Sequence, residues 1–141
     1  MNRIVLIALM CMSLLFSGCM KQVPGKNDIV GIWVSNDGAI LEFKEDGTFD
    51  GKSLPGEHFT HSQDEVWKDF DGSGNWKLED GQQFWQIELE FKEKNNQKGS
   101  YGYQVYVSGS NTFENKPPWY LFVWEYNDID TGDRYKFTKK E

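Results

Sequence analysis

Residues 85–91 read WQIELEF, and this stretch decides the expected fold. Large apolar side chains occupy every second position, and the positions between them are polar. Successive side chains of a β-strand point to opposite faces, so this alternation predicts a strand with one buried and one wetted face. Residues 39–45 (AILEFKE) and 101–107 (YGYQVYV) alternate in the same way. No amphipathic helix longer than two turns competes with these stretches, and the chain is therefore predicted to be all-β.

Turn signals separate the apolar runs at short intervals. Asn-Asp-Gly at 36–38 and Asp-Gly at 46–47 and 80–81 lie between alternating stretches. Glycine accepts the positive φ that tight hairpin turns require, so these motifs predict antiparallel neighbours. A meander of eight strands can close on itself and remove exposed edges, which predicts an eight-stranded antiparallel up-and-down barrel. The expected strands are 30–35, 38–45, 48–53, 73–79, 83–92, 100–108, 119–127 and 133–139.

Two connections are longer than the others. Residues 54–72 contain both histidines of the chain and the stretch 62–70 (SQDEVWKDF). Ser62 is a suitable N-cap for a two-turn helix there, so this connection is predicted to be a long loop carrying one short helix. Residues 109–118 form a polar loop that ends in two prolines.

The first residues of the chain predict secretion. Arg3 precedes an apolar stretch, 4–16, which falls short of the roughly 20 residues that a spanning helix needs. Ser17 and Gly18 then lead to Cys19, and such a charged start, apolar run and small-residue end describe a secretory signal. The Ser-Gly-Cys end resembles the lipobox of bacterial lipoproteins. In that family the chain is cut before the cysteine, which then receives acyl chains.

This resemblance implies an organisation of the chain and a location in the cell. Residues 1–18 would be the signal peptide, 19–28 a tether, and 29–141 the folded domain. Cys19 would carry the lipid (palmitate), in the bacterial cell envelope. Met20 is not the Asp that retains enteric lipoproteins at the inner membrane, so the outer membrane, facing the periplasm, is expected. With Cys19 used for lipid, the domain has no disulfide and must rely on its core.

Short motifs on the expected strands point to a family of barrels. Gly31-Ile32-Trp33 on the first strand of the meander resembles the Gly-x-Trp signature of lipocalins, and residues 46–49 (DGTF) look like a turn of bacterial lipocalin-like lipoproteins. In lipocalins an arginine near the end of the last strand packs on that tryptophan. The resemblance therefore implies that Trp33 and Arg134 form a pair that closes one end of the barrel. It also implies binding rather than catalysis.

Aromatic residues make up 16% of the chain, and they allow two interpretations of the barrel interior. The rings could line a cavity for an apolar or ring-shaped ligand, or they could fill a barrel that holds nothing. Trp33, Trp85, Tyr103 and Trp124 are the candidate lining residues. The stretch 119–127 (WYLFVWEYN) is apolar on both faces, so its outer face should be covered by the 54–72 loop or by a partner.

Other chemistries find little support. His58 and His61 lie near Glu57, Asp64 and Asp69, but no third metal ligand has a diagnostic spacing, so no metal or other cofactor is predicted. The chain has no Gly-x-Ser-x-Gly motif and no free cysteine after the signal, so no enzymatic activity is predicted. The formal net charge of −7 disfavours nucleic acid as a partner.

Two functions remain as predictions. In the first, the barrel binds a small hydrophobic or amphipathic molecule. In the second, the barrel is solid and its acidic surface binds a basic envelope protein, as inhibitor or immunity lipoproteins do. The candidate partner-binding residues then lie in the 54–72 loop and are Asp64, Glu65, Trp67 and Asp69. The oligomeric state is left open.

Overall fold

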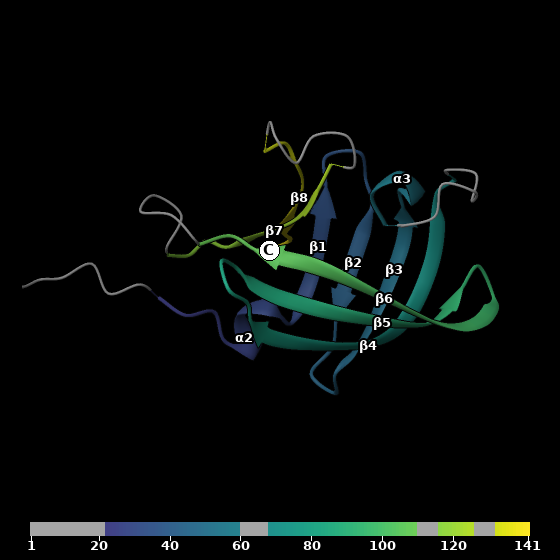
Figure 1. The fold of residues 1–141 in the computed structure, drawn as a ribbon, viewed down its shortest axis with the longest axis horizontal. Helices are drawn as coiled ribbons and strands as arrows, with labels where there is room; N and C mark the ends of the chain where they lie inside the picture. The colour runs from purple at the N-terminus through teal and green to yellow at the C-terminus, as the bar shows by residue number, and fades with distance from the viewer. Residues whose placement is uncertain (1–21, 60–67, 110–115, 126–131) are drawn as a thin grey trace, which may run out of the picture.

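In the computed structural model of the chain, eight antiparallel strands close into a barrel in the order of the sequence. The structure describes residues 22–59, 68–109, 116–125 and 132–141. The strands are β1 Gly31–Ser35, β2 Ile40–Phe43, β3 Thr48–Leu54, β4 Phe70–Asp80, β5 Trp85–Lys94, β6 Gln97–Val107, β7 Tyr120–Trp124 and β8 Arg134–Lys139. Figure 1 shows the long, curved β4–β6 crossing in front of β1–β3. The predicted all-β barrel with eight strands in a meander is confirmed.

The hairpin turns form where the Asp-Gly motifs predict them. Gly38 has a φ of 96° and Gly47 a φ of 87°, a region that other residues rarely occupy. The connection between β5 and β6 is shorter than the sequence predicts. Asn95 and Asn96 take φ values of 50° and 63° between paired Lys94 and Gln97, which makes a two-residue turn. β6 is therefore longer than expected, and β5 begins and ends two residues later than expected.

The long connection between β3 and β4 differs from its prediction. It contains a one-turn helix, α3 Gly56–Phe59, before the expected position. The expected helix at 62–70 is wrong at its end, because Lys68 and Asp69 are not helical and Phe70 already belongs to β4. Phe70 is buried and pairs with Leu54, so it forms part of the sheet and not of a helix. Residues 62–67 lie outside the described part.

A second short helix, α2 Lys26–Ile29, overlaps the end of the segment expected to be a tether, 19–28. Ile29 is fully buried, and its carbonyl accepts a hydrogen bond of 2.7 Å from the indole N–H of Trp33. The helix α2 therefore packs as part of the folded domain. Within the described residues, no helix has the length and apolar character needed to cross a membrane.

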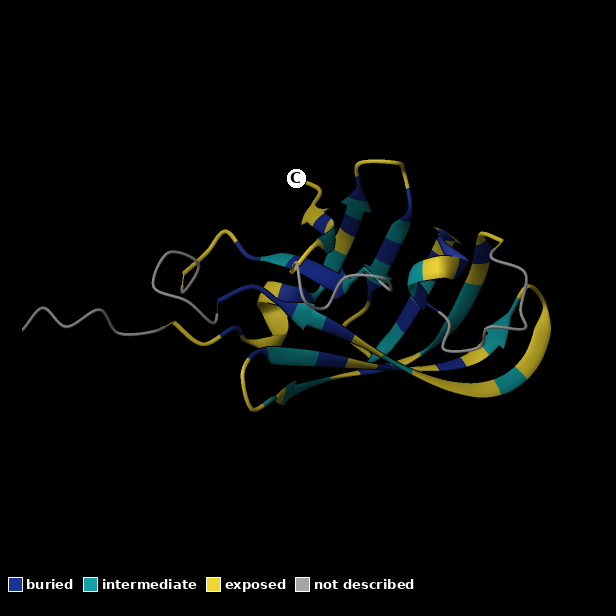
Figure 2. Ribbon diagram, turned by 45° about the horizontal axis from the view of Figure 1, so that its top comes forward, coloured by how far each residue is buried: buried dark blue, intermediate teal, exposed yellow. Residues whose placement is uncertain are grey.

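Buried positions recur along the strands, where Figure 2 colours the ribbon dark blue, and their apolar side chains form the core of the barrel. Phe43 packs edge-on against Trp76, with ring centroids 5.3 Å apart, and Phe49 packs in the same way against Phe91 at 4.9 Å. Inward-facing rings of this kind add to the burial that stabilises the fold. The centre of the barrel is therefore a packed core.

The outer face of β7 is covered by side chains from neighbouring strands, and not by the described residues of the 54–72 loop. Phe122 is fully buried although it points outward. Phe84, from the connection between β4 and β5, lies 5.2 Å from it edge-on, and Tyr106 stacks on it at 5.5 Å. Trp124 completes this group, which we call the outer aromatic cluster (Phe84, Tyr106, Tyr120, Phe122 and Trp124).

Arg134 belongs to the outer aromatic cluster, which corrects the expected pair with Trp33. Its guanidinium lies 4.3 Å from the ring centre of Phe122 and donates a 2.6 Å hydrogen bond to the Tyr120 hydroxyl. The cation over Trp33 is Lys139, whose Nζ lies 5.6 Å from the ring centre. The register explains the difference, because Trp33 pairs with Lys139 while Arg134 begins the other end of β8.

Candidate ligand-binding site

The weakest seam of the barrel lies between β6 and β7. Strand β6 pairs with β5 at nine positions but with β7 only through Tyr106 and Val107. The reason is length, since β6 spans residues 97–107 and β7 only 120–124. The N-terminal part of β6 consequently extends past its neighbour on that side.

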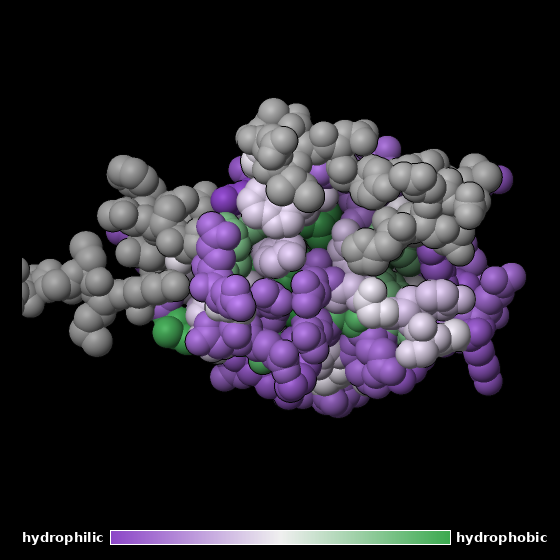
Figure 3. All heavy atoms as spheres, in the orientation of Figure 1, coloured by the Kyte–Doolittle hydropathy of each residue, from purple (hydrophilic) through white to green (hydrophobic). Residues whose placement is uncertain are grey.

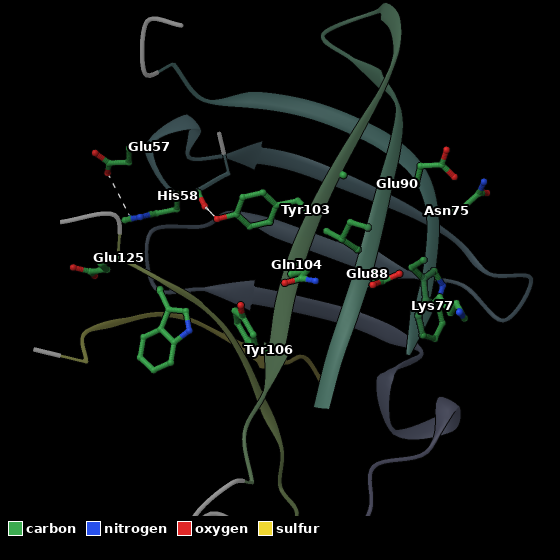
Figure 4. A pocket seen from close by; sticks show the side chains of 14 residues that line it. Glu57, His58, Asn75, Lys77, Glu88, Glu90, Tyr103, Gln104, Tyr106 and Glu125 are labelled. Carbon is green, nitrogen blue, oxygen red and sulfur yellow. Dashed lines mark hydrogen bonds and ion pairs between the residues drawn. The ribbon is translucent and has the colours of Figure 1, made fainter. Parts of the chain in front are cut away.

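A pocket of about 980 Å³ lies along this part of β6. It is half open, and its lining comes from β4, β5, β6, the end of β7 and α3 (Figure 4). Three aromatic residues contribute to it: Tyr103, Tyr106 and Trp124. Trp76 and Leu89 also border it but are almost wholly buried, so they add little surface. In Figure 3 the face over β4–β6 is mainly hydrophilic, with less polar residues visible in a hollow.

The charged lining of the pocket is mainly acidic. Four glutamates border it, Glu57, Glu88, Glu90 and Glu125, against one lysine and one histidine. Glu90 is already engaged by Lys92 and Ser100. Hydrogen bonding to Lys92 is the main reason that the pKa of Glu90 lies below its ordinary value. The pocket therefore has a negative potential that favours a cationic or polar group at its rim.

Tyr103 joins the barrel to α3 at the edge of the pocket. Its hydroxyl donates a hydrogen bond to the backbone carbonyl of His58, and its ring lies 5.0 Å from that of Phe59. Burial raises the pKa of Tyr103 to about 12. The hydroxyl thus stays protonated in the neutral range and holds α3 against β6.

His58 lies beside this contact and is held by stacking. Its ring packs on Tyr135 with the centroids 4.5 Å apart, and Nε2 lies 3.6 Å from a carboxylate oxygen of Glu57. Tyr135 is itself fixed, because its hydroxyl donates a 2.5 Å hydrogen bond to Asp37. Within the described part of the chain, the buried Nδ1 of His58 has no hydrogen-bond partner. It is therefore a buried polar atom that no described residue satisfies.

Of the four residues expected to line a cavity, two border the pocket and two do not. Tyr103 and Trp124 border the pocket together, from β6 and β7. Trp33 lies in the core and Trp85 is half-buried against it, and neither borders the pocket. Trp124 points to the outer face while the other three point inward, since paired strands alternate in register.

The residues expected to bind a protein partner lie mostly outside the described part of the chain. Asp64, Glu65 and Trp67 fall there, as does His61. Asp69 is described and exposed just before β4. Among the described residues no group of three His, Cys, Asp or Glu side chains is close enough to hold a metal ion.

Sequence reasoning missed the polar wall of the pocket. Glu88, Glu90 and Gln104 occupy outward positions of the alternating strands and look like solvated side chains in the sequence. The register places Glu90 opposite Gly102 and Glu88 opposite Gln104, which brings these groups side by side. The alternation could have identified the shared outer face, but not the hollow beside it.

Comparison with protein-family models, with curated proteins and with solved structures finds no match to this chain. The fold itself, a closed eight-stranded antiparallel barrel with two one-turn helices in its described part, is compatible with lipocalin-like binding proteins.

Proposed function

We propose that the protein is a lipid-anchored lipoprotein of the bacterial envelope whose barrel binds a small hydrophobic or amphipathic molecule without transforming it. The pocket beside β6 is the observation that carries this proposal. Its volume of about 980 Å³ lies at the upper end of the range that small-molecule sites occupy. Such sites combine aromatic surface with a few polar groups that orient the ligand.

The lining suggests how an amphipathic molecule would lie. The rings of Tyr103, Tyr106 and Trp124 would contact its apolar part, because they are the aromatic residues of the lining that are only partly buried. The carboxylate of Glu88 and the amide of Gln104 would face its polar part (Figure 4). Because packed side chains fill the centre of the barrel, the ligand would bind in the pocket beside β6 and not along the barrel axis.

Binding is testable with residues 22–141, which contain all eight strands and the whole described core. The probes are dodecanoate, dodecyltrimethylammonium and haemin, each titrated while tryptophan fluorescence is followed. Gly102→Phe is the blocking variant, because a Cβ at position 102 meets no atom within 4 Å and the ring can enter the pocket. Lys98→Phe is the matched control, since Lys98 is exposed on the same strand and does not border the pocket.

At least one probe should bind saturably to the wild type and to Lys98→Phe. Its affinity for Gly102→Phe should be lower by about tenfold or more. Fluorescence that no probe changes would contradict the proposal. Equal affinity of Gly102→Phe and the wild type would show that the ligand binds elsewhere.

The proposed anchor is tested separately in growing bacteria. Labelled palmitate should appear on the protein and should be lost in Cys19→Ser, since several acyl chains are needed for stable anchoring. The labelled protein should sediment with the outer membrane. An unlabelled wild-type protein would contradict the anchor and leave the binding site unaffected.

A further inference from the structure

Three side chains on the outer faces of β5 and β6 border the pocket: Glu88, Gln104 and Tyr106 (Figure 4). Glu88 and Gln104 stand opposite each other, and Tyr106 lies two residues further along β6. Residues two apart on a strand share a face, so all three side chains lie on the same side of the sheet. Within the described part of the chain, none of the three forms a side-chain hydrogen bond or an ion pair.

The lysine nearest to this group in the register does not neutralise it. Lys77 on β4 stands opposite Glu88, but its Nζ forms an ion pair with Glu79. The next outward carboxylate of β5, that of Glu90, is paired with Lys92. Among the described residues, Glu88 is therefore a carboxylate of the pocket wall whose charge no ion pair compensates.

Tyr106 brings an aromatic ring close to this carboxylate. Diagonal neighbours on one face of an antiparallel pair lie about 7–8 Å apart, within reach of long side chains. Glu88 and Tyr106 are such diagonal neighbours, because Glu88 pairs with Gln104. The ring of Tyr106 stacks on Phe122 with the centroids 5.5 Å apart, yet it is only partly buried and borders the pocket.

The outer aromatic cluster already holds one cation in this way. The guanidinium of Arg134 lies over Phe122 at 4.3 Å from the ring centre and over Trp124 at 5.3 Å. In the described residues no lysine or arginine lies over the ring of Tyr106. The negative face of an aromatic ring attracts a cation. Tyr106 and Glu88 together therefore offer a second position for a cation, on the side of the cluster that borders the pocket.

We infer that the pocket selects an alkylammonium, an organic cation with an apolar chain, whose head group lies between the carboxylate of Glu88 and the ring of Tyr106. This inference rests on the proposed function, because it assigns the charge of the ligand that the pocket binds. The rest of the pocket, with a total volume of about 980 Å³, receives the apolar chain. An anionic amphiphile is disfavoured, since four glutamates border the same volume.

The test compares three probes that share a dodecyl chain and differ in charge. They are dodecyltrimethylammonium, its neutral analogue dodecyldimethylamine N-oxide, and dodecanoate. Each is titrated below its micellar concentration into residues 22–141 at neutral pH, and calorimetry measures the affinity. Glu88→Gln removes the carboxylate and Tyr106→Leu removes the ring, whereas Tyr106→Phe keeps a ring. Glu45→Gln is the matched control, because Glu45 is also exposed but does not border the pocket.

The ammonium probe should bind the wild type about tenfold or more tightly than the amine oxide, and dodecanoate should bind more weakly still. Glu88→Gln and Tyr106→Leu should each lower the affinity for the ammonium probe by about threefold to fivefold. Glu45→Gln and Tyr106→Phe should leave that affinity nearly unchanged. Lys77→Gln should raise it, because this substitution removes a competing positive charge from the pocket wall.

The outcomes separate this inference from the proposed function. If the amine oxide or dodecanoate binds as tightly as the ammonium probe, the inference is overturned and the proposed function stands, because the pocket then binds amphiphiles without selecting their charge. The same conclusion follows if Glu88→Gln and Tyr106→Leu both bind the ammonium probe as tightly as Glu45→Gln does. If none of the three probes binds, both the inference and the proposed function are overturned.

Discussion

Trp33→Phe should destabilise the barrel strongly, for a reason that the structure locates in one hydrogen bond. The indole N–H donates to the carbonyl of Ile29 at 2.7 Å, and both residues are buried. Phenylalanine leaves that carbonyl without its partner, which costs about 1–3 kcal/mol. The smaller ring adds a packing defect of about 1–2 kcal/mol. The free energy of unfolding should therefore fall by about 3 kcal/mol, and the melting temperature by about 10 °C for a domain of this size.

Urea unfolding followed by far-ultraviolet circular dichroism measures this change without relying on the removed tryptophan. Trp85→Phe is the matched control, because Trp85 is half-buried and its indole N–H has no described partner. It should cost less than about 1 kcal/mol. Lys139→Gln removes the exposed cation over Trp33 and should cost about 0.5–1 kcal/mol. If Trp33→Phe is no worse than Trp85→Phe, the hydrogen bond to α2 does not support the barrel as argued.

Three further outcomes are expected. Arg134→Met should lower the free energy of unfolding by about 1–2 kcal/mol in urea, because it removes a guanidinium from the outer aromatic cluster, whereas Lys98→Met, at an exposed lysine of β6 outside that cluster, should cost less. Gly74→Ala should cost about 1–3 kcal/mol or more in the same assay, because its Cβ would lie 1.9 Å from a backbone oxygen of β5, while Gly102→Ala should be tolerated. The pKa of Tyr103 is about 12 in the folded protein against 10.0 ordinarily, so its contribution to stability is complete below pH 10 and is lost between pH 10 and about 12. Tyr103→Phe should therefore reduce the fall in the free energy of unfolding over that pH window. An unchanged pH profile of the variant would refute this role.

The anchoring of the chain stays a prediction made from its first residues. The Ser-Gly-Cys end at residues 17–19 lies outside the described part, and so does the acidic stretch around Asp64 and Glu65. The protein-capture alternative, which rests on that loop, also stays a prediction.

Most of the fold could be predicted because its signals are local. Alternation along WQIELEF predicted the buried face of β5, and the glycines at 38 and 47 take the positive φ expected of their hairpins. The two-residue turn at Asn95–Asn96 was missed because the polar stretch around it shows no alternation, although asparagine tolerates positive φ. The ends of the strands were harder to predict than the strands themselves, because the pairing partner decides where a strand stops.

The amino-acid sequence by itself determined the number of strands, their order and which face of each is apolar, because these depend on spacing along the chain. Only the tertiary structure decided that Arg134 contacts the outer aromatic cluster, that Lys139 covers Trp33, and that β6 extends beyond β7. These outcomes depend on register, twist and strand length, which set contacts between residues far apart in sequence. The pocket is one of them, because it exists only where a long strand passes a short neighbour.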